Sequence, residues 1–156
     1  MTGLSFSVSV QEEDFDPGAL QDALLSGTAS EGAVATFTGY VRHSNEGSAV
    51  EHMRLEHYPG MTEKSITAIM SEAAGRWPLL AAGVVHRVGD LVPGDRIVWV
   101  GVSSAHRGAA FSACEFIMDY LKTGAPFWKK ELGPEGEHWV AARASDDERA
   151  ERWQAK

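Results

Sequence analysis

The chain has 156 residues, of which 44% are hydrophobic and 23% are charged, and its formal net charge is −8. This composition is typical of one globular domain, which we expect to span residues 1–156. The acidic balance argues against broad contact with nucleic acid, and no apolar run approaches the roughly 20 residues that cross a bilayer. The N-terminus has neither the basic nor the apolar part of a secretory signal, so we expect a cytoplasmic protein.

The first half of the chain is predicted to contain three strands and two helices. Apolar residues alternate over 4–10, which indicates a half-buried strand. Asp16 as N-cap and Pro17 as first helical residue predict a short helix that ends at Gly27. The remaining predicted elements are a strand over 31–42, a polar mobile loop over 43–49, a strand over 49–58 and a helix over 61–76.

The second half is predicted to begin with an antiparallel hairpin, because the short turn LVPGD joins strands over 81–90 and 95–104. A helix over 108–122 follows, ended by Gly124 and Pro126. The apolar stripe of this helix consists of Phe111, Cys114, Ile117, Met118 and Leu121. A strand over 138–143 and a helix that Ser145 and Glu148 begin as a capping box complete a single α/β domain of mixed strands.

His106 and Arg107 stand at the predicted N-terminus of the helix over 108–122. Cations are mildly unfavourable at this end of a helix, which carries about half a positive charge. Backbone N–H groups, an imidazole and a guanidinium at one helix end would suit a phosphate. The alternative is that both side chains simply point to solvent.

Lys122 and Lys129 lie on either side of a Gly-Ala-Pro turn. The turn folds the chain back, so both amines can face one cleft, where an ammonium group could serve acid/base or nucleophilic chemistry. The alternative is that Lys122 complements the helix dipole in solvent. Between residues 103 and 130, four lysines and arginines stand against two carboxylates, so this segment is locally basic within an acidic chain.

Arg42 and Arg143 each end a predicted strand, where loops commonly contact substrates, although arginines there are also common as solubilising charges. The single cysteine, Cys114, lies within an apolar stripe, which favours a small buried residue over a sulfur-carrying nucleophile. The histidines and this cysteine show no spacing typical of a zinc site.

Five segments, in this order and spacing, resemble the large catalytic subunits of molybdopterin synthase, the MoaE family. The resemblance runs from about residue 31 to residue 153, and its longest part has the pattern SAHR…FIMDYLKT…APFWK. The segments are GAVATFTGYVR, LEHYPGMTEK, HRVGDLVPGD, VGVSSAHRGAAFSACEFIMDYLKTGAPFWKKE and PEGEHWVAAR.

This resemblance implies an α/β hammerhead fold with an additional antiparallel β-sheet, in a homodimer at the centre of a heterotetramer. It implies a small ubiquitin-like sulfur-carrier subunit as partner, whose Gly-Gly C-terminus bears a thiocarboxylate. The implied reaction transfers two sulfurs to cyclic pyranopterin monophosphate and forms the dithiolene of molybdopterin. No cofactor, metal, nucleic acid or membrane is expected to bind this subunit.

The residues that match the family's functional positions are Lys122 and Lys129 as the active-site lysines, Met118 near the channel for the carrier's tail, and five residues of the pterin and phosphate pocket, Phe37, Arg42, His106, Arg107 and Arg143. The resemblance implies that part of this pocket comes across the dimer interface. Tyr40 and Gly124 depart from the family, where many relatives carry cations at these positions.

The two lysines receive separate roles in our hypothesis. Lys122 orients the thiocarboxylate and stabilises the oxyanion formed at its carbonyl, and Lys129 is a general acid or base at the pterin. Two rival hypotheses are a catalytically silent module that binds an anion or a ubiquitin-like tail, and a nucleotide or RNA binder that uses Trp128 and the lysines.

Overall fold

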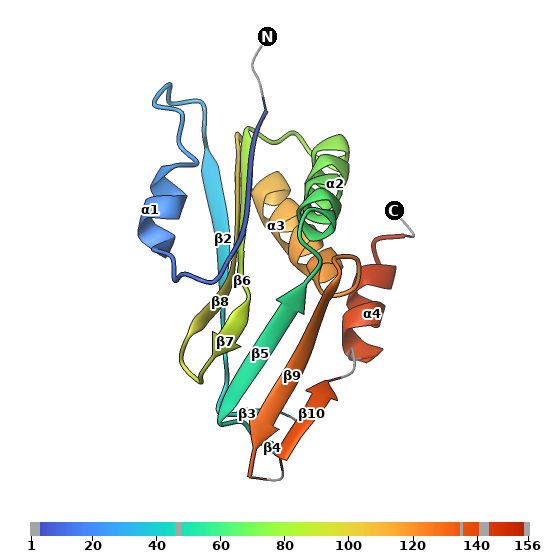
Figure 1. Ribbon diagram of the computed structural model, residues 1–156. Helices are drawn as coiled ribbons and strands as arrows, with labels where there is room; N and C mark the ends of the chain where they lie inside the picture. Colours follow the sequence, from blue (N-terminus) through green and yellow to red (C-terminus); the bar gives the residue numbers. More distant parts are fainter. Residues whose placement is uncertain (1–3, 46–47, 135, 141–143, 155–156) are drawn as a thin grey trace.

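The computed structural model describes residues 4–45, 48–134, 136–140 and 144–154 (Figure 1). Its elements, in chain order, are β1 (Ser5–Gln11), α1 (Pro17–Asp22), β2 (Ala33–Tyr40), β3 (Ser44–Asn45), β4 (Ser48–Ala49), β5 (His52–His57), α2 (Met61–Arg76), β6 (Ala81–Arg87), β7 (Gly89–Leu91), β8 (Arg96–Ser104), α3 (Arg107–Leu121), β9 (Phe127–Gly133), β10 (Gly136–Val140) and α4 (Ala144–Glu151).

The larger sheet has the strand order β1-β6-β8-β2. β6 pairs in parallel with β1 and antiparallel with β8, and β2 pairs antiparallel with β8. The antiparallel β6–β8 pair confirms the predicted hairpin. The short strand β7 lies in the connection between them and belongs to the other sheet.

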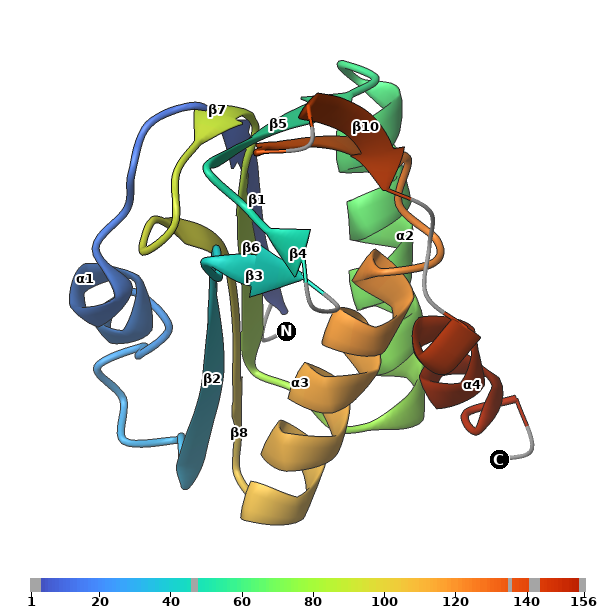
Figure 2. The same ribbon diagram turned by 90° about the horizontal axis from the view of Figure 1, so that it is seen from below.

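Both faces of the larger sheet are covered, with α1 on one side and α2 and α3 on the other (Figures 1 and 2). The main core lies on the α2 and α3 side and includes Val84, Val100, Ile66 and Ile117, all without exposed surface. A smaller cluster around Trp99 lies on the α1 side. The central strands β6 and β8 are therefore buried on both faces, as two-sided sheets are.

The smaller sheet has the order β10-β9-β5-β7, and all its neighbours are antiparallel. This confirms the additional antiparallel sheet that the sequence resemblance implied. Strand β9 was not predicted, because Gly124, Pro126 and the lysines favoured a turn through this part of the chain. Pairing with β5 and β10, rather than local preference, makes residues 127–133 a strand.

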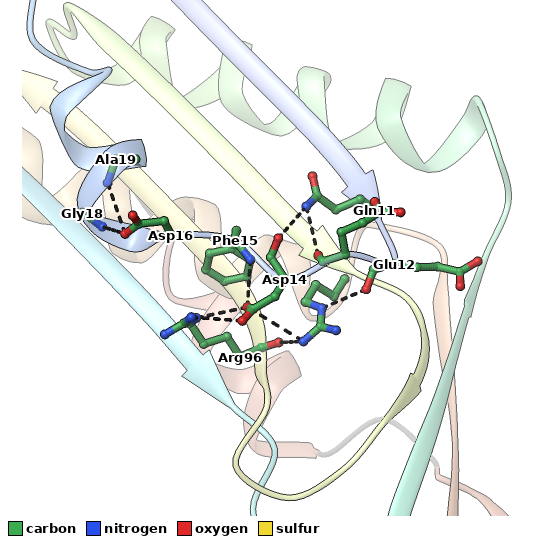
Figure 3. A network of polar contacts seen from close by, with 10 residues as sticks. Gln11, Glu12, Asp14, Phe15, Asp16, Gly18, Ala19 and Arg96 are labelled. Atoms are coloured by element: carbon green, nitrogen blue, oxygen red, sulfur yellow. Dashed lines mark hydrogen bonds and ion pairs between the residues drawn. The ribbon is translucent and has the colours of Figure 1, made fainter.

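The segment between β1 and α1 is tied to the larger sheet by the polar contacts that Figure 3 shows. Arg96 of β8 donates two hydrogen bonds to the carboxylate of Asp14, over 3.1 and 3.0 Å. Asp16 is the N-cap of α1, as predicted, and its Oδ1 accepts the backbone N–H groups of Gly18 and Ala19. The helix ends at Asp22, however, well before the predicted stop at Gly27.

Helix α2 has the predicted bounds, and α3 confirms the predicted helix with one error in its stripe. Cys114, Ile117 and Leu121 are buried and Met118 is half-buried, but Phe111 is 68% exposed. Phe111 lies about 100° around the helix from Ala110, which is at the centre of the buried face. Phe116, which was not in the predicted stripe, is buried instead.

Two predictions for the remaining chain differ from the structure, the loop over 43–49 and the start of the last helix. Within residues 43–49, expected as a loop, the short strands β3 and β4 pair with each other. Helix α4 begins at Ala144, one residue before the predicted N-cap Ser145. The predicted strand over 138–143 is confirmed as far as Val140, and its last residues lie outside the described part of the chain.

Helix α4 is held on α3 by a group of five residues that we call the α3–α4 cluster: Glu115, Asp119, Arg149, Arg152 and Trp153. The buried carboxylate of Asp119 accepts hydrogen bonds from the Trp153 indole over 2.7 Å, from Arg149 over 3.1 Å and from Arg152 over 3.2 Å. Both arginines also pair with the exposed carboxylate of Glu115. The cluster therefore holds α4 against the last two turns of α3.

Among the described helices, none has both the length and the apolar content that crossing a membrane requires.

Candidate active site

Lys122 is the C-cap of α3, and its side chain is exposed. Met118 lies one turn earlier on the same helix, half-buried against the main core. A lysine at a helix C-terminus interacts favourably with the helix dipole. The position of Lys122 therefore fits both predicted roles, that of a catalytic ammonium group and that of a charge complementing the helix dipole. The groups around Lys122 decide between them.

Lys129 lies at the middle of the smaller sheet, paired with Leu55 of β5 and Val140 of β10. Side chains alternate along a strand, so Phe127, Lys129 and Glu131 share one face of β9. This is the face toward the main core, because Phe127 packs against that core and Glu131 is buried. The half-buried ammonium of Lys129 lies 3.9 Å from Oε2 of Glu131.

A stacked pair of rings, His86 of β6 and Phe127 of β9, lies near both lysines. The ring centroids are 4.0 Å apart and the planes are inclined by 21°. The ammonium of Lys122 is close enough to His86 to influence its titration, and Lys129 is two residues beyond Phe127 on the same face. Lys122 and Lys129 thus lie at the same end of the molecule, near this stack.

The imidazole of His86 is buried in β6. Its Nδ1–H donates to the backbone carbonyl of Arg87 over 2.9 Å, which leaves the other ring nitrogen unprotonated. The pKa of His86 is lowered from 6.5 to about 4, mainly by burial and to a lesser extent by the nearby charges of Lys122 and His57. The ring is therefore neutral at pH 7.

A neutral buried histidine makes the stability of the fold depend on pH. Between pH 6.5 and about 4 the unfolded chain binds a proton at His86 that the folded chain does not, so stability falls as the pH falls through this window. We expect the free energy of unfolding to decrease by about 2 kcal/mol between pH 7 and pH 5 from this group. Urea denaturation at pH 7 and pH 5 measures this decrease in the free energy of unfolding, and the variant His86→Phe should not show it. Equal pH dependence in both proteins would contradict the prediction.

His106 and Arg107 lie at the opposite end of α3 from Lys122. His106 is the N-cap, Arg107 is the first helical residue, and both side chains are exposed. A helix of 15 residues separates them from Lys122 by about 22 Å. Within one chain, therefore, these two residues and Lys122 lie at opposite ends of α3, because a straight helix keeps its two ends apart.

Two other predicted pocket residues, Phe37 and Arg42, lie on β2 or directly after it. Phe37 projects from β2 with 42% of its surface exposed. Arg42 follows the strand and is also exposed. The end of β2 near Arg42 pairs with Arg96, at the start of β8, and His86 pairs with the nearby Val98. Arg42 therefore lies at the lysine end of the larger sheet, while Arg143 lies outside the described residues.

Cys114 is buried in α3, and its thiol contacts the backbone carbonyl of Val100. Burial, with a smaller effect from the charge of Glu115, raises the pKa of the thiol to about 12. A thiol in this state is a poor nucleophile at neutral pH, as the sequence indicated. Among the described residues, no three or more His, Cys, Asp and Glu side chains form a group that could hold a metal ion.

The carboxylates of α3 do little to offset the charge of Lys122. The two carboxylates between residues 103 and 130, Glu115 and Asp119, are both engaged by arginines of α4. They are therefore neutralised within the α3–α4 cluster. Lys122, one turn beyond Asp119, is left to act on an approaching anion with little opposition from these two groups.

Three residues near the lysines were missed in the sequence: His86, Glu131 and Thr62, a buried threonine of α2. The sequence pattern around His86 does not reveal its burial, because alternation does not distinguish inside from outside in a strand that is buried on both faces. Glu131 could have been found from its position two residues after Lys129, had β9 been recognised as a strand. No sequence signal distinguishes Thr62 from an ordinary residue of the first turn of a helix.

The structure is that of a mixed α/β protein with two sheets, and known proteins share this fold. The family model described as "MoaE protein" matches residues 10–124. The molybdopterin synthase catalytic subunit of Vibrio cholerae is 58% identical over 147 residues, covering 94% of this chain and 97% of that protein. The chain belongs to the MoaE family.

Solved structures agree with this assignment. A molybdopterin biosynthesis MoaE protein from Burkholderia ambifaria superposes with a TM-score of 0.82 at 50% identity, covering 96% of this chain and 99% of that one. A protein–protein complex of subunits 1 and 2 of molybdopterin-converting factor from Helicobacter pylori contains a chain with a TM-score of 0.71 at 18% identity, covering 87% of this chain and 91% of that one. At that identity the similarity shows the shared fold alone.

Proposed function

We propose that this chain is a sulfurtransferase that converts cyclic pyranopterin monophosphate to the dithiolene of molybdopterin. The sulfur comes from the thiocarboxylate at the C-terminus of a small ubiquitin-like carrier. The observation that carries the proposal is that Lys122 and Lys129 lie at one end of the molecule, near the His86–Phe127 stack. The activity named for the 58% identical Vibrio cholerae relative supports it.

The reaction requires two anions to approach each other, the substrate phosphate and the thiocarboxylate. Cationic groups in a partly dry site reduce this repulsion much more than the same groups in water. In our proposal Lys122 orients the thiocarboxylate and stabilises the oxyanion that develops at its carbonyl. Lys129, held beside Glu131, transfers protons to and from the pterin as general acid or base.

A second copy of the chain is proposed to complete the site. His106 and Arg107 lie about 22 Å from Lys122 along α3, too far to contact a substrate held at the lysines of their own chain. In a homodimer these two residues can reach the lysines of the partner. Together with Arg42, Phe37 and Arg143 they would then hold the pterin and its phosphate.

The proposed assembly is a homodimer with one small carrier subunit at each end. The Helicobacter pylori complex of two subunits of molybdopterin-converting factor supports a partner of this kind. Met118, half-buried one turn before Lys122, would lie beside the channel for the carrier's tail. The proposed reaction needs no cofactor bound to this subunit, and it is proposed to take place in the cytoplasm.

The test is to mix the purified protein with a thiocarboxylated small subunit and cyclic pyranopterin monophosphate, and to search for the dithiolene product by mass spectrometry. The proposal predicts product that depends on both the protein and the thiocarboxylate. A carrier that ends in an ordinary carboxylate is the control. Tight binding of the carrier without product would instead support the catalytically silent binding module.

A further inference from the structure

The segment that joins the two lysines, residues 123–128, is held at three points. Ala125 is buried in the main core. The backbone carbonyl of Pro126 accepts a hydrogen bond from the hydroxyl of Thr62 over 3.1 Å. Phe127 stacks on His86 at 4.0 Å between centroids. The path from Lys122 to Lys129 is therefore determined by contacts with α2 and β6, which lie outside the segment.

Thr62 makes two hydrogen bonds that connect separate parts of the chain. Its side chain has no exposed surface, and its Oγ1 also accepts the backbone N–H of Tyr58 over 3.0 Å. The one hydroxyl thus links the end of β5 to the turn that precedes β9. A hydroxyl is well suited to this position because it donates and accepts at the same time.

The start of α2 does not need the Thr62 hydroxyl as a cap. Glu63 already performs that function, because its carboxylate accepts the backbone N–H of Gly60 over 2.8 Å. Gly60 has a positive φ of 85°, a conformation that favours glycine, and it turns the chain from β5 into α2. The hydroxyl of Thr62 is therefore available to bond the backbone of Tyr58 and Pro126, which both lie outside α2.

We propose that Thr62 is a positioning residue for the reaction: it fixes where β9, and with it Lys129, begins relative to the end of α3 and Lys122. The inference rests on the proposed sulfur transfer. Without the hydroxyl, the backbone carbonyl of Pro126 loses the hydrogen bond from Thr62. The distance between the two ammonium groups is then no longer fixed by this contact. A displacement of about 1 Å at reacting groups can cost about 10²-fold in rate.

The effect should appear in kcat and not in KM. Thr62 contacts the segment between the lysines, whereas the proposed anion-binding residues His106, Arg107 and Arg42 lie on other elements. Binding of the pterin substrate should therefore persist while the chemical step slows. A purely structural role would instead lower the fraction of folded protein without changing the kcat of the folded molecules.

The experiment compares two pairs of proteins, and within each pair the difference is the hydroxyl at position 62. The first pair is the wild type and Thr62→Val, and the second pair is Thr62→Ser and Thr62→Ala. Thr67→Val is the matched control, since the Thr67 hydroxyl donates a hydrogen bond within α2, to the carbonyl of Glu63 over 3.0 Å. Steady-state dithiolene formation is measured per folded protein, with the folded fraction taken from circular dichroism. We expect kcat to fall about 10-fold or more in each hydroxyl-free member, with KM changed less than about 2-fold.

Equal kcat values for the two members of each pair would overturn the inference. A decrease in the kcat of Thr67→Val as large as that of Thr62→Val would also overturn it. If Thr62→Val does not fold, the Ser and Ala pair decides, and if neither hydroxyl-free variant folds, Thr62 is a stability residue and the inference is wrong. Wild-type protein that makes no dithiolene would contradict the proposed function itself. Activity in the wild type with no difference within the pairs contradicts only the role of Thr62.

Discussion

Replacing Lys122 or Lys129 by alanine is expected to reduce dithiolene formation by about 10²-fold or more. Each substitution removes one cation that meets an anionic reactant, and the α3–α4 cluster provides no replacement because its arginines are paired with Glu115 and Asp119. The rate is measured with saturating thiocarboxylated carrier and cyclic pyranopterin monophosphate. Binding of the carrier is measured separately, so that a loss of docking is distinguished from a loss of chemistry.

Lys130→Ala is the matched control for this prediction. Lys130 is the next residue along β9, but its side chain lies on the other face of the sheet, over the ring of Trp139 and 3.9 Å from Glu137. A change in general surface charge would affect all three variants, whereas a catalytic role predicts that Lys130→Ala keeps most of the activity. Product formation near the wild-type rate in both Lys122→Ala and Lys129→Ala would rule out the proposed roles.

The largest expected effect on stability is that of Asp119→Ala. The substitution leaves the buried Trp153 indole without its acceptor and removes the carboxylate that Arg149 and Arg152 share. Because both arginines are about half exposed and can be rehydrated, we expect the free energy of unfolding to fall by about 2 to 3 kcal/mol. For a chain of this size this corresponds to a decrease in Tm of roughly 5 to 10 °C.

Glu115→Ala tests whether burial of the carboxylate is the cause. Glu115 pairs with the same two arginines, but its side chain is 45% exposed, so its loss should cost less than about 1 kcal/mol. Urea or thermal unfolding of the two variants provides the comparison. Equal destabilisation by Glu115→Ala and Asp119→Ala would show that the arginine pairing, and not the buried carboxylate with its indole, holds α4.

Much of the fold was predictable because several segments have strong local signals. Helix α2 has the predicted bounds, and Asp16 caps α1 as its position before Pro17 indicated. Strand β9 was missed because its residues have little local preference for a strand and adopt one by pairing with two neighbours. Phe111 was misplaced because helical spacing alone does not show where the buried face is centred.

The candidate site residues were proposed from the sequence, and their geometry comes from the structure. The two lysines and the turn between them were visible in the sequence, whereas the His86–Phe127 stack near them depends on the position of β9 in the smaller sheet. The separation of His106 and Arg107 from Lys122 follows from the length of α3, which the sequence predicts correctly. What the sequence lacked was any sign of Thr62 and Glu131, whose environments come from distant segments.

The chain order of the two sheets determines when each can form during synthesis. The larger sheet draws only on strands that end by Ser104, whereas the smaller one needs β9 and β10, which end at Val140. The ribosome therefore delivers the scaffold before the lysine-bearing strand, and the α4 helix last of all. A nascent or truncated chain that stops near residue 120 has its scaffold strands but leaves the open edge of β5 unpaired, a surface on which chaperones and quality-control proteases can act.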